Sequence, residues 1–341
     1  MGTSTDEQSV LVSIVIPARE WDAFLEGTLA SVACQVLGPD VDVEVIVALG
    51  GVAPDTVPNG VRVVANPTGT IPDGLNLAIA ASAGDVVIRV DARCVVQPDH
   101  VARVLARLDD AEIGCIGGAA LTLDRGLFGS AYAVAFNSPL LGPTIYRYRR
   151  TSGTADAAYL GAWRRTDLDA LGGFDSRMIR NQDNELADRV RASGKTVWYD
   201  ADLVVGYFNA RDFASALAHH HEFGLWRMVQ RQQGQRAFTS RHVAAVGAAA
   251  LMAGAGGAVF AGRRTRPFAV VGAATVYAAA GAYAWRSARL LRRARPDIDG
   301  PDFHPLAPVL APAVATAVNG AWLAGVARGA WRHSRGRSPR S

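Results

Sequence analysis

The sequence predicts an α/β fold with a mostly parallel sheet, followed by a C-terminal hydrophobic helical region that associates with a membrane. Over the first 120 residues, short apolar runs alternate with segments of helical periodicity, which is typical of a parallel α/β sheet. Of the 341 residues, 50% are hydrophobic, and the mean hydropathy of +0.11 is high for a soluble enzyme. Beyond position 240, three uncharged segments each have the length that a bilayer crossing requires.

The predicted strands are short apolar runs, and they cover 11–16, 43–49, 61–65, 86–90 and 113–118. The predicted helices between them cover 21–37, 73–82 and 98–110. A later helix, strand and helix are predicted at 182–193, 196–200 and 212–233. Gly84 is expected to close the helix before it in the left-handed C′ conformation. In open sheets ligands bind beyond the carboxyl ends of the strands, so Asp91 and the turn at 17–20 are expected at a ligand site.

Three hydrophobic segments are predicted to meet the membrane, and they cover 243–261, 267–285 and 305–327. Arginines bracket these segments, which suits anionic lipid headgroups better than nucleic acid. The alternative is a set of buried helices in a soluble domain. Prolines interrupt the third segment, which therefore spans, kinks or lies in the interface. The polar, acidic N-terminus lacks the pattern of a signal peptide, so the N-terminal domain is expected in the cytosol.

Two aspartates are candidates for chemistry. Asp91 directly follows a hydrophobic strand, and its carboxylate would suit Mg²⁺ or Mn²⁺; the alternative is a turn or N-cap residue. If the chain stays extended after Asp91, Arg93 projects to the same side. Asp183 lies near the start of an amphipathic helix, where it is either a general base or part of a solvated acidic face that the helix dipole favours.

Five motifs occur in an order that resembles a known family, and they are IVIPARE (14–20), NPTGTIPDGLN (66–76), VVIRVDARC (86–94), GGFD (172–175) and RNQDNELADRVRASG (180–194). Together they are similar to family-two inverting glycosyltransferases of GT-A fold. They most resemble the membrane-bound glucosyltransferases of bacterial exopolysaccharide assembly, succinoglycan type. The resemblance covers residues 10–235 and continues into a hydrophobic C-terminus.

The resemblance implies inverting transfer of a sugar from a nucleotide diphosphate sugar, with a UDP-sugar favoured, to a lipid-linked acceptor. Asp183 matches the catalytic base, and Asp91 matches the acid that holds Mg²⁺ or Mn²⁺. The implied donor-binding residues are Pro17, Ala18, Glu20, Asn66, Asn76 and Arg93. The implied acceptor-side residues are Gly173, Phe174, Asp175, Arg189 and Trp226.

The predicted organisation is a polar tail over 1–10, a GT-A domain over 11–235, membrane-associated helices over 241–331 and a basic tail over 332–341. The expected location is the bacterial plasma membrane, with the catalytic domain in the cytoplasm. The glycine pairs at 117–118 and 172–173 are expected to serve packing and turns.

The sequence departs from the family pattern at three places. Arg93 stands at the second acid position of Asp-x-Asp, Gln182 replaces the first acid of the Glu-Asp pair, and Ala48–Gly50 lacks an acid that many relatives have. Arg93 either contributes positive charge toward a phosphate or points to solvent. These departures leave two rivals open, a polyprenyl-phosphate glycosyl synthase and a non-catalytic membrane scaffold.

Overall fold

The computed structural model describes residues 9–124, 126–139, 141, 151–208, 212–232, 247, 250, 254, 266–294 and 303–335. It divides into two compact units. The first unit comprises Met1–Ala119 and Arg149–Val205, and the second comprises Ala120–Tyr148 and Gly206–Ser341. The chain passes from one unit to the other within strands β6 and β9.

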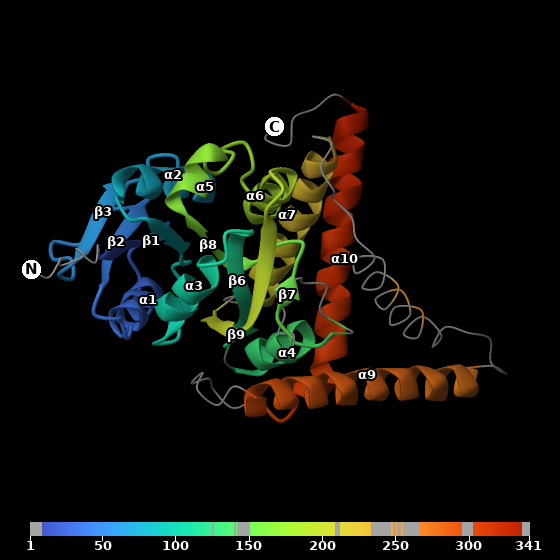
Figure 1. Cartoon of the computed structure of the whole chain (residues 1–341). Coiled ribbons are helices and arrows are strands. Elements are labelled where there is room, and N and C mark those ends of the chain that lie inside the picture. Colours follow the sequence, from blue (N-terminus) through green and yellow to red (C-terminus); the bar gives the residue numbers. More distant parts are fainter. Residues whose placement is uncertain are drawn as a thin grey trace, which may run out of the picture. The chain divides into compact units, whose positions relative to one another are not determined.

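Among the described residues, nine strands form one sheet (Figure 1). They are β1 (Val10–Ala18), β2 (Val41–Leu49), β3 (Val61–Ala65), β4 (Val86–Arg89), β5 (Cys94–Val95), β6 (Ile113–Thr122), β7 (Gly153–Thr154), β8 (Tyr159–Arg164) and β9 (Thr196–Tyr207). The order is β3-β2-β1-β4-β8-β6-β9-β5, with β7 paired to β9. Strands β3, β2, β1 and β4 are parallel, as predicted, whereas β8 is antiparallel to both β4 and β6. The sheet is therefore mixed, and its parallel half contains the first four predicted strands.

The first unit has five helices among the described residues. They are α1 (Ala23–Ala33), α2 (Ile71–Ala81), α3 (His100–Leu108), α5 (Arg165–Ala170) and α6 (Gln182–Ala192). Four lie close to predicted helices, and α5 lies in a segment where no helix was predicted. Helix α1 begins where it does because the Asp22 carboxylate accepts hydrogen bonds from the N–H groups of Phe24 and Leu25. Helix α2 starts at a Thr70 N-cap with Pro72 in its first turn, three residues before the predicted Asp73 start.

Gly84 does not have the predicted role at the end of α2. The helix ends with Ser82 in an extended conformation, and Gly84 is absent from the glycines with positive φ. A Cβ at Gly84 would lie 2.5 Å from Ser13 Oγ and 2.6 Å from Ser13 N in β1. The glycine is therefore required by the close approach of the chain to β1. Gly117 and Gly118 likewise serve packing, as predicted, because a Cβ at Gly118 would lie 1.4 Å from Leu203 O.

Two consecutive arginines at the end of β8 fix helices on opposite faces of the sheet. Arg164 Nη1 donates to Ile113 O at 2.8 Å and Nη2 donates to Asp110 O at 2.6 Å, just beyond α3. Arg165 Nη1 donates to Ile79 O of α2 and Nε donates to Gly84 O, both at 3.0 Å. Arg164 ends β8 and Arg165 begins α5, and their side chains reach the end of α3 and the end of α2, which cover different faces of the sheet, as Figure 1 shows.

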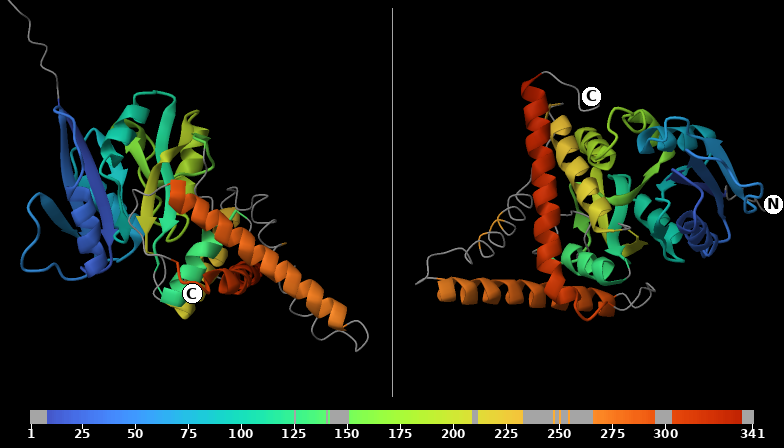
Figure 2. Two further views of the ribbon diagram at one scale, coloured as in Figure 1. Left: turned by 90° about the horizontal axis from the view of Figure 1, so that it is seen from below. Right: turned by 180° about the vertical axis from the view of Figure 1, so that it is seen from behind.

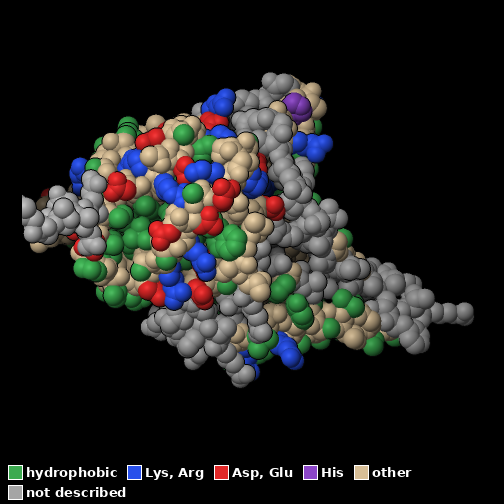
Figure 3. Space-filling view, in the orientation of Figure 1, with side chains coloured by type: hydrophobic (Ala, Val, Ile, Leu, Met, Phe, Trp, Pro, Cys, Tyr) green, Lys and Arg blue, Asp and Glu red, His purple; other side chains and the backbone are tan. Residues whose placement is uncertain are grey.

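The surface of the first unit carries both signs of charge. Figure 3 shows acidic and basic side chains intermixed on the face that it presents. Several of these charges form ion pairs, such as Arg103 with Asp99 at 2.6 Å and Arg107 with the buried Asp200 at 2.8 Å. An exposed pair such as Arg103 with Asp99 contributes little to stability.

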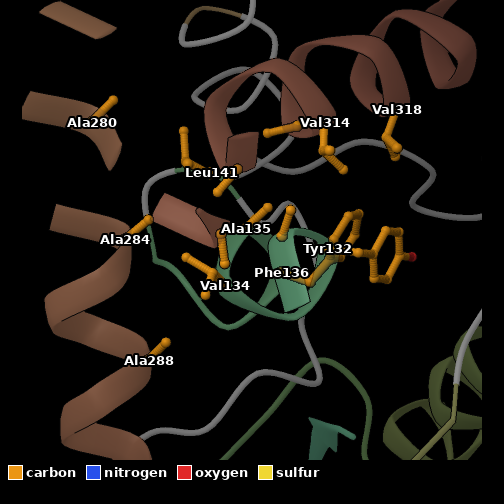
Figure 4. Close-up of a cluster of buried hydrophobic side chains, with 14 of the residues drawn as sticks. Tyr132, Val134, Ala135, Phe136, Leu141, Ala280, Ala284, Ala288, Val314 and Val318 are labelled. Carbon is orange, nitrogen blue, oxygen red and sulfur yellow. The ribbon is translucent and has the colours of Figure 1, made fainter. Parts of the chain in front are cut away.

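The second unit is helical in its described part apart from the ends of β6 and β9. Its helices are α4 (Gly126–Phe136), α7 (Phe213–Gln232), α9 (Arg266–Ala294) and α10 (Ala307–Ser334). Buried residues of α4, α9 and α10 form one apolar cluster, in which Tyr132 stacks on Phe136 (Figure 4). His220 of α7 joins this cluster through a 2.8 Å hydrogen bond between its Nε2 and the Tyr132 hydroxyl.

Glycines let α10 approach its neighbours very closely. Helix α7 runs alongside α10 (Figure 2). A Cβ at Gly224 would lie 2.0 Å from Trp322 O, and a Cβ at Gly325 would lie 1.9 Å from His221 O. Gly281 of α9 makes a similar approach to Pro308 O. The two backbones of each pair are therefore in direct contact, as in the small-residue interfaces of membrane helices.

The predicted membrane segments have different outcomes. The segment at 243–261 lies almost entirely outside the described residues. The segment at 267–285 forms part of α9. Within the described ranges, α10 is the one helix that is long and apolar enough to cross a membrane, with a hydropathy of 1.5 over its best window. The proline-interrupted third segment is thus helical, with Pro312 inside the helix. The predicted basic tail begins within this helix, and residues 336–341 lie outside the described part.

Candidate active site

The carboxyl ends of the parallel strands bring the predicted donor-binding turns to one edge of the sheet. Ala18 at the end of β1 pairs with Leu49 of β2, and Leu49 pairs with Ala65 of β3. Beyond these pairs, the Asn66 N–H donates to Leu49 O at 2.8 Å. Pro17, Ala18 and Glu20 therefore lie at the same edge as Asn66, where ligands bind in open α/β sheets.

A buried arginine joins Asp91 and Asp183, which are 92 positions apart in the sequence. Arg89 is the last residue of β4, and its Nε donates to Asp91 Oδ1 at 2.8 Å. Its Nη1 donates to Asp183 Oδ1 in the first turn of α6. Only 5% of the Arg89 side chain is exposed, against 23% for Asp91 and 22% for Asp183. The two acids thus lie between the guanidinium and solvent.

The two carboxylates stabilise the charged form of Arg89. Burial by itself lowers the pKa of Arg89, but the carboxylates of Asp183 and Asp91 outweigh it, so the pKa lies above its ordinary value. Sequence reasoning missed this residue, although a signal was present. An arginine inside the apolar run VVIRV must be buried, and a buried charge requires a counter-ion.

Arg93 does not project to the side of Asp91 as an extended chain would require. The chain turns after β4, because the Cys94 N–H donates back to Asp91 O at 3.1 Å. The Arg93 guanidinium lies 4.6 Å from the centre of the Phe24 ring and 3.9 Å from Asp22 Oδ2. Its contacts are thus with the start of α1, and its donor-binding role stays a prediction.

The two asparagines that were predicted to bind the donor also make hydrogen bonds within the protein. Asn66 is buried, its Nδ2 donates to Thr70 O at 2.9 Å, and its Oδ1 accepts from the Thr68 hydroxyl at 3.0 Å. Asn76 of α2 reaches across to Phe174, where Nδ2 donates to the carbonyl at 2.8 Å and Oδ1 accepts from the N–H at 2.9 Å. Asn76 therefore holds the turn that was predicted to lie on the acceptor side.

That turn, Gly172–Asp175, is further fixed by its own residues. Gly172 and Gly173 have φ of +75° and +69°, which favour glycine, as the turn prediction requires. Asp175 pairs with Arg177, and hydrogen bonds from Arg177 lower the pKa of the Asp175 carboxyl. Arg189 of α6 donates to Leu171 O at 2.5 Å and forms a two-point pair with Glu185. Arg189 thus supports the turn from α6.

A divalent cation would find one suitable carboxylate here. Arg89 donates one hydrogen bond to Oδ1 of Asp91, and the carboxylate keeps acceptor capacity that can coordinate a cation. The described residues contain no group of three or more His, Cys, Asp or Glu side chains that could hold a metal by themselves. Mg²⁺ is commonly bound through one or two carboxylates together with substrate phosphates and water, so the residues present fit a cation that arrives with its substrate.

A model of glycosyl transferase family 21 matches residues 72–333, which include Asp91, Asp183 and the 172–175 turn. The chain belongs to glycosyl transferase family 21. It is therefore a glycosyltransferase that transfers sugar from a nucleotide sugar. Membership of family two and the succinoglycan-type likeness stay predictions. No match is found among curated protein sequences.

The likeness of this family 21 chain to the first solved structure below shows the GT-A fold, as predicted. The chain is similar to the mannosyltransferase PcManGT from Pyrobaculum calidifontis in complex with GDP-Man and Mn²⁺, with 15% identity, a TM-score of 0.52, and coverage of 95% of this chain and 88% of that chain. S. aureus TarS 1–349 gives 13% identity, a TM-score of 0.46, and coverage of 96% and 92%. GalNAc-T7 with UDP, GalNAc and Mn²⁺ gives 16% identity, a TM-score of 0.47, and coverage of 61% and 44%.

All the predicted site residues of this family 21 glycosyltransferase except Trp226 lie in the first unit. Trp226 belongs to α7 of the second unit, where it is 7% exposed. Its place beside the acceptor stays a prediction.

Proposed function

We propose that this family 21 glycosyltransferase transfers a sugar, with inversion, to a lipid-linked saccharide at the bacterial plasma membrane, with its catalytic unit in the cytoplasm. The observation that carries the proposal is the pairing of Asp91 and Asp183 through Arg89. A displacement of this kind needs a base for the acceptor and charge compensation for the leaving diphosphate. The two acids can meet these needs side by side.

In the proposed reaction, the acceptor hydroxyl oxygen forms a bond to the anomeric carbon as the bond from that carbon to the diphosphate oxygen breaks. Asp183 takes the hydroxyl proton, and the nucleoside diphosphate leaves with the bonding electron pair. Asp91 lies on the donor side and would hold Mg²⁺ or Mn²⁺. A bound cation would supply positive charge to the diphosphate. Pro17, Ala18, Glu20 and Asn66 would border the donor.

The donor and acceptor are narrower parts of the proposal. We favour a UDP-sugar because of the motif resemblance, whereas the PcManGT structure was solved with GDP-Man. That structure also contains Mn²⁺, which supports a divalent cation as cofactor. The apolar helix α10 supports membrane association, and a site at a membrane suits an acceptor that carries a lipid. The turn at Gly173, Phe174 and Asp175, supported by Arg189, would border this acceptor.

The test is a donor and acceptor screen with the full-length protein in membranes, scored by release of nucleoside diphosphate. We expect release from one nucleotide sugar that depends on both a divalent cation and a lipid-linked saccharide. Asp183→Asn should retain donor binding and lose at least about 100-fold in kcat, since a positioned base contributes on that order.

Other outcomes separate the rivals. Near-normal turnover of Asp183→Asn with a polyprenyl phosphate as acceptor would favour the glycosyl synthase, because a phosphate needs little help from a base. The scaffold interpretation is disfavoured by the family match. Failure of the wild-type protein to bind any nucleoside diphosphate in the presence of Mg²⁺ or Mn²⁺ would support the scaffold interpretation.

A further inference from the structure

Arg89 differs from an ordinary surface ion-pair partner in its position. It sits at the end of β4, in the middle of the sheet, with 5% of its side chain exposed. Both of its acidic partners are several times more exposed. A substrate that reaches the acids from solvent therefore meets the carboxylates before the guanidinium. Arg89 is therefore less accessible to a substrate than either of its acidic partners.

Arg89 contacts the two acids through two different nitrogens of one guanidinium, an arrangement that we call the fork. Nε of Arg89 donates to Asp91 and Nη1 donates to Asp183, so one rigid planar group fixes both carboxylates at once. The two acids come from different elements, since Asp91 follows β4 and Asp183 lies in α6. Among the interactions of the described residues, this fork is the direct link between them. A lysine has one nitrogen on a flexible stem and could not hold both acids in the same way.

We propose that Arg89 is a positioning residue that sets the separation of the donor-side acid Asp91 and the base Asp183. This inference rests on the proposed function. Transfer in one step requires the acceptor hydroxyl at Asp183 to face the anomeric carbon while the diphosphate lies toward Asp91. A displacement of about 1 Å in such an arrangement can cost about 100-fold in rate. The positive charge of Arg89 also lets two carboxylates lie close together, at a site where Arg93 replaces the family's second acid.

The experiment compares Arg89→Lys with wild type in the detergent-solubilised full-length protein. We expect kcat to fall about 30-fold or more, with a smaller rise of the donor KM through the displaced Asp91, because the donor-binding turns at 17–20 and 66–76 lie on other strands. Arg165→Lys is the matched control. It also shortens a half-buried arginine with several hydrogen bonds in the first unit, but its partners are at the end of α2. Its kcat should stay near the wild-type value at a temperature where it is folded.

A double-mutant cycle tests whether Arg89 acts through the base. If it does, the kcat loss of Arg89→Lys combined with Asp183→Asn should be clearly smaller than the product of the two single losses, with the remaining extra loss arising through Asp91. Multiplied losses, or a wild-type kcat for folded Arg89→Lys, would overturn the proposal. If Arg89→Lys does not fold, Arg89→Gln, which carries no buried charge, takes its place in the same cycle.

A second readout does not depend on activity. In urea unfolding, Arg89→Lys and Asp183→Asn should each lower the midpoint, and the double variant should be less destabilised than the sum of the two. Additive midpoints would show that the fork does not hold the acids and would overturn the inference. An inactive wild-type protein in the donor screen would instead refute the proposed function, and the unfolding cycle would still decide the geometry.

Discussion

Asn76 connects α2 to the turn at Gly173–Asp175, and its removal gives the sharpest test of how this turn is held. Its amide both donates to and accepts from the backbone of Phe174, at 2.8 and 2.9 Å. Asn76→Leu keeps the size of the side chain and removes both hydrogen bonds. Each neutral hydrogen bond contributes about 1 kcal/mol, so we expect a loss of about 2 kcal/mol in the free energy of unfolding.

Asn76→Asp separates the two bonds. The carboxylate can still accept from the Phe174 N–H, but it cannot donate to the Phe174 carbonyl and places an oxygen against it. We expect a loss of stability at least as large as that of Asn76→Leu, since two acceptors face each other without a proton between them. Unfolding in urea, followed by tryptophan fluorescence in detergent, measures both variants.

The functional consequence identifies the side of the site on which Asn76 acts. In the structure its amide binds the turn that we propose to border the acceptor, although the sequence resemblance assigned Asn76 to the donor. We therefore expect Asn76→Leu to raise the acceptor KM about tenfold, which corresponds to about 1.4 kcal/mol, with a smaller effect on the donor KM. Asn66→Leu is the matched comparison, because the hydrogen bonds of the Asn66 side chain to the described residues are local, to Thr68 and Thr70. Its effect should fall on the donor KM.

Two results would refute this reasoning. Asn76→Leu and Asn76→Asp that unfold within about 0.5 kcal/mol of wild type would show that the bonds to Phe174 contribute nothing, since typical surface substitutions fall in that range. A selective rise of the donor KM in Asn76→Leu would return Asn76 to the donor side.

Two further predictions concern stability. His100 is buried, both ring nitrogens lack a hydrogen-bond partner among the described residues, and burial lowers its pKa to about 4. The unfolded chain binds this proton near pH 6.5, so the neutral histidine's contribution to stability is complete above pH 6.5 and is lost as the pH falls toward 4, by about 3 kcal/mol. His100→Leu should flatten unfolding curves measured over this window, and an unchanged pH dependence would contradict the assignment. Gly325→Ala places a Cβ 1.9 Å from His221 O and should lower the free energy of unfolding by at least about 1–3 kcal/mol, measured by thermal unfolding. In Gly320→Ala, in the same helix, the new Cβ meets nothing within 4 Å, so this variant should be neutral or stabilising. Equal melting temperatures for the two glycine variants would show that α10 does not pack on α7 as described.

Much of the first unit could be predicted from the sequence because its determinants are local. β3 has its predicted bounds, and β1, β2 and β4 differ from theirs by at most two residues at either end, because uninterrupted apolar runs bounded by turn residues determine them. Helix α6 was also expected, and its early acids suit the dipole at its N-terminal end. Strand β8 was not among the predicted strands, and its direction could not have been predicted either, since periodicity is the same for parallel and antiparallel strands. The role of Gly84 was missed for a related reason, because Ser13 lies 71 positions away and only folding brings it near.

The candidate site shows the same division. The local pattern made Asp91 at a strand end and Asp183 at the start of a helix candidates, and the family resemblance added the GGFD turn. Only the tertiary structure decided what connects them. Arg89 lies between the two acids, and Asn76 binds the turn 98 positions away, because a buried charge and a half-buried amide must find partners wherever the fold provides them. Such partners are determined by distance in space, and a single sequence does not encode that distance in its local pattern.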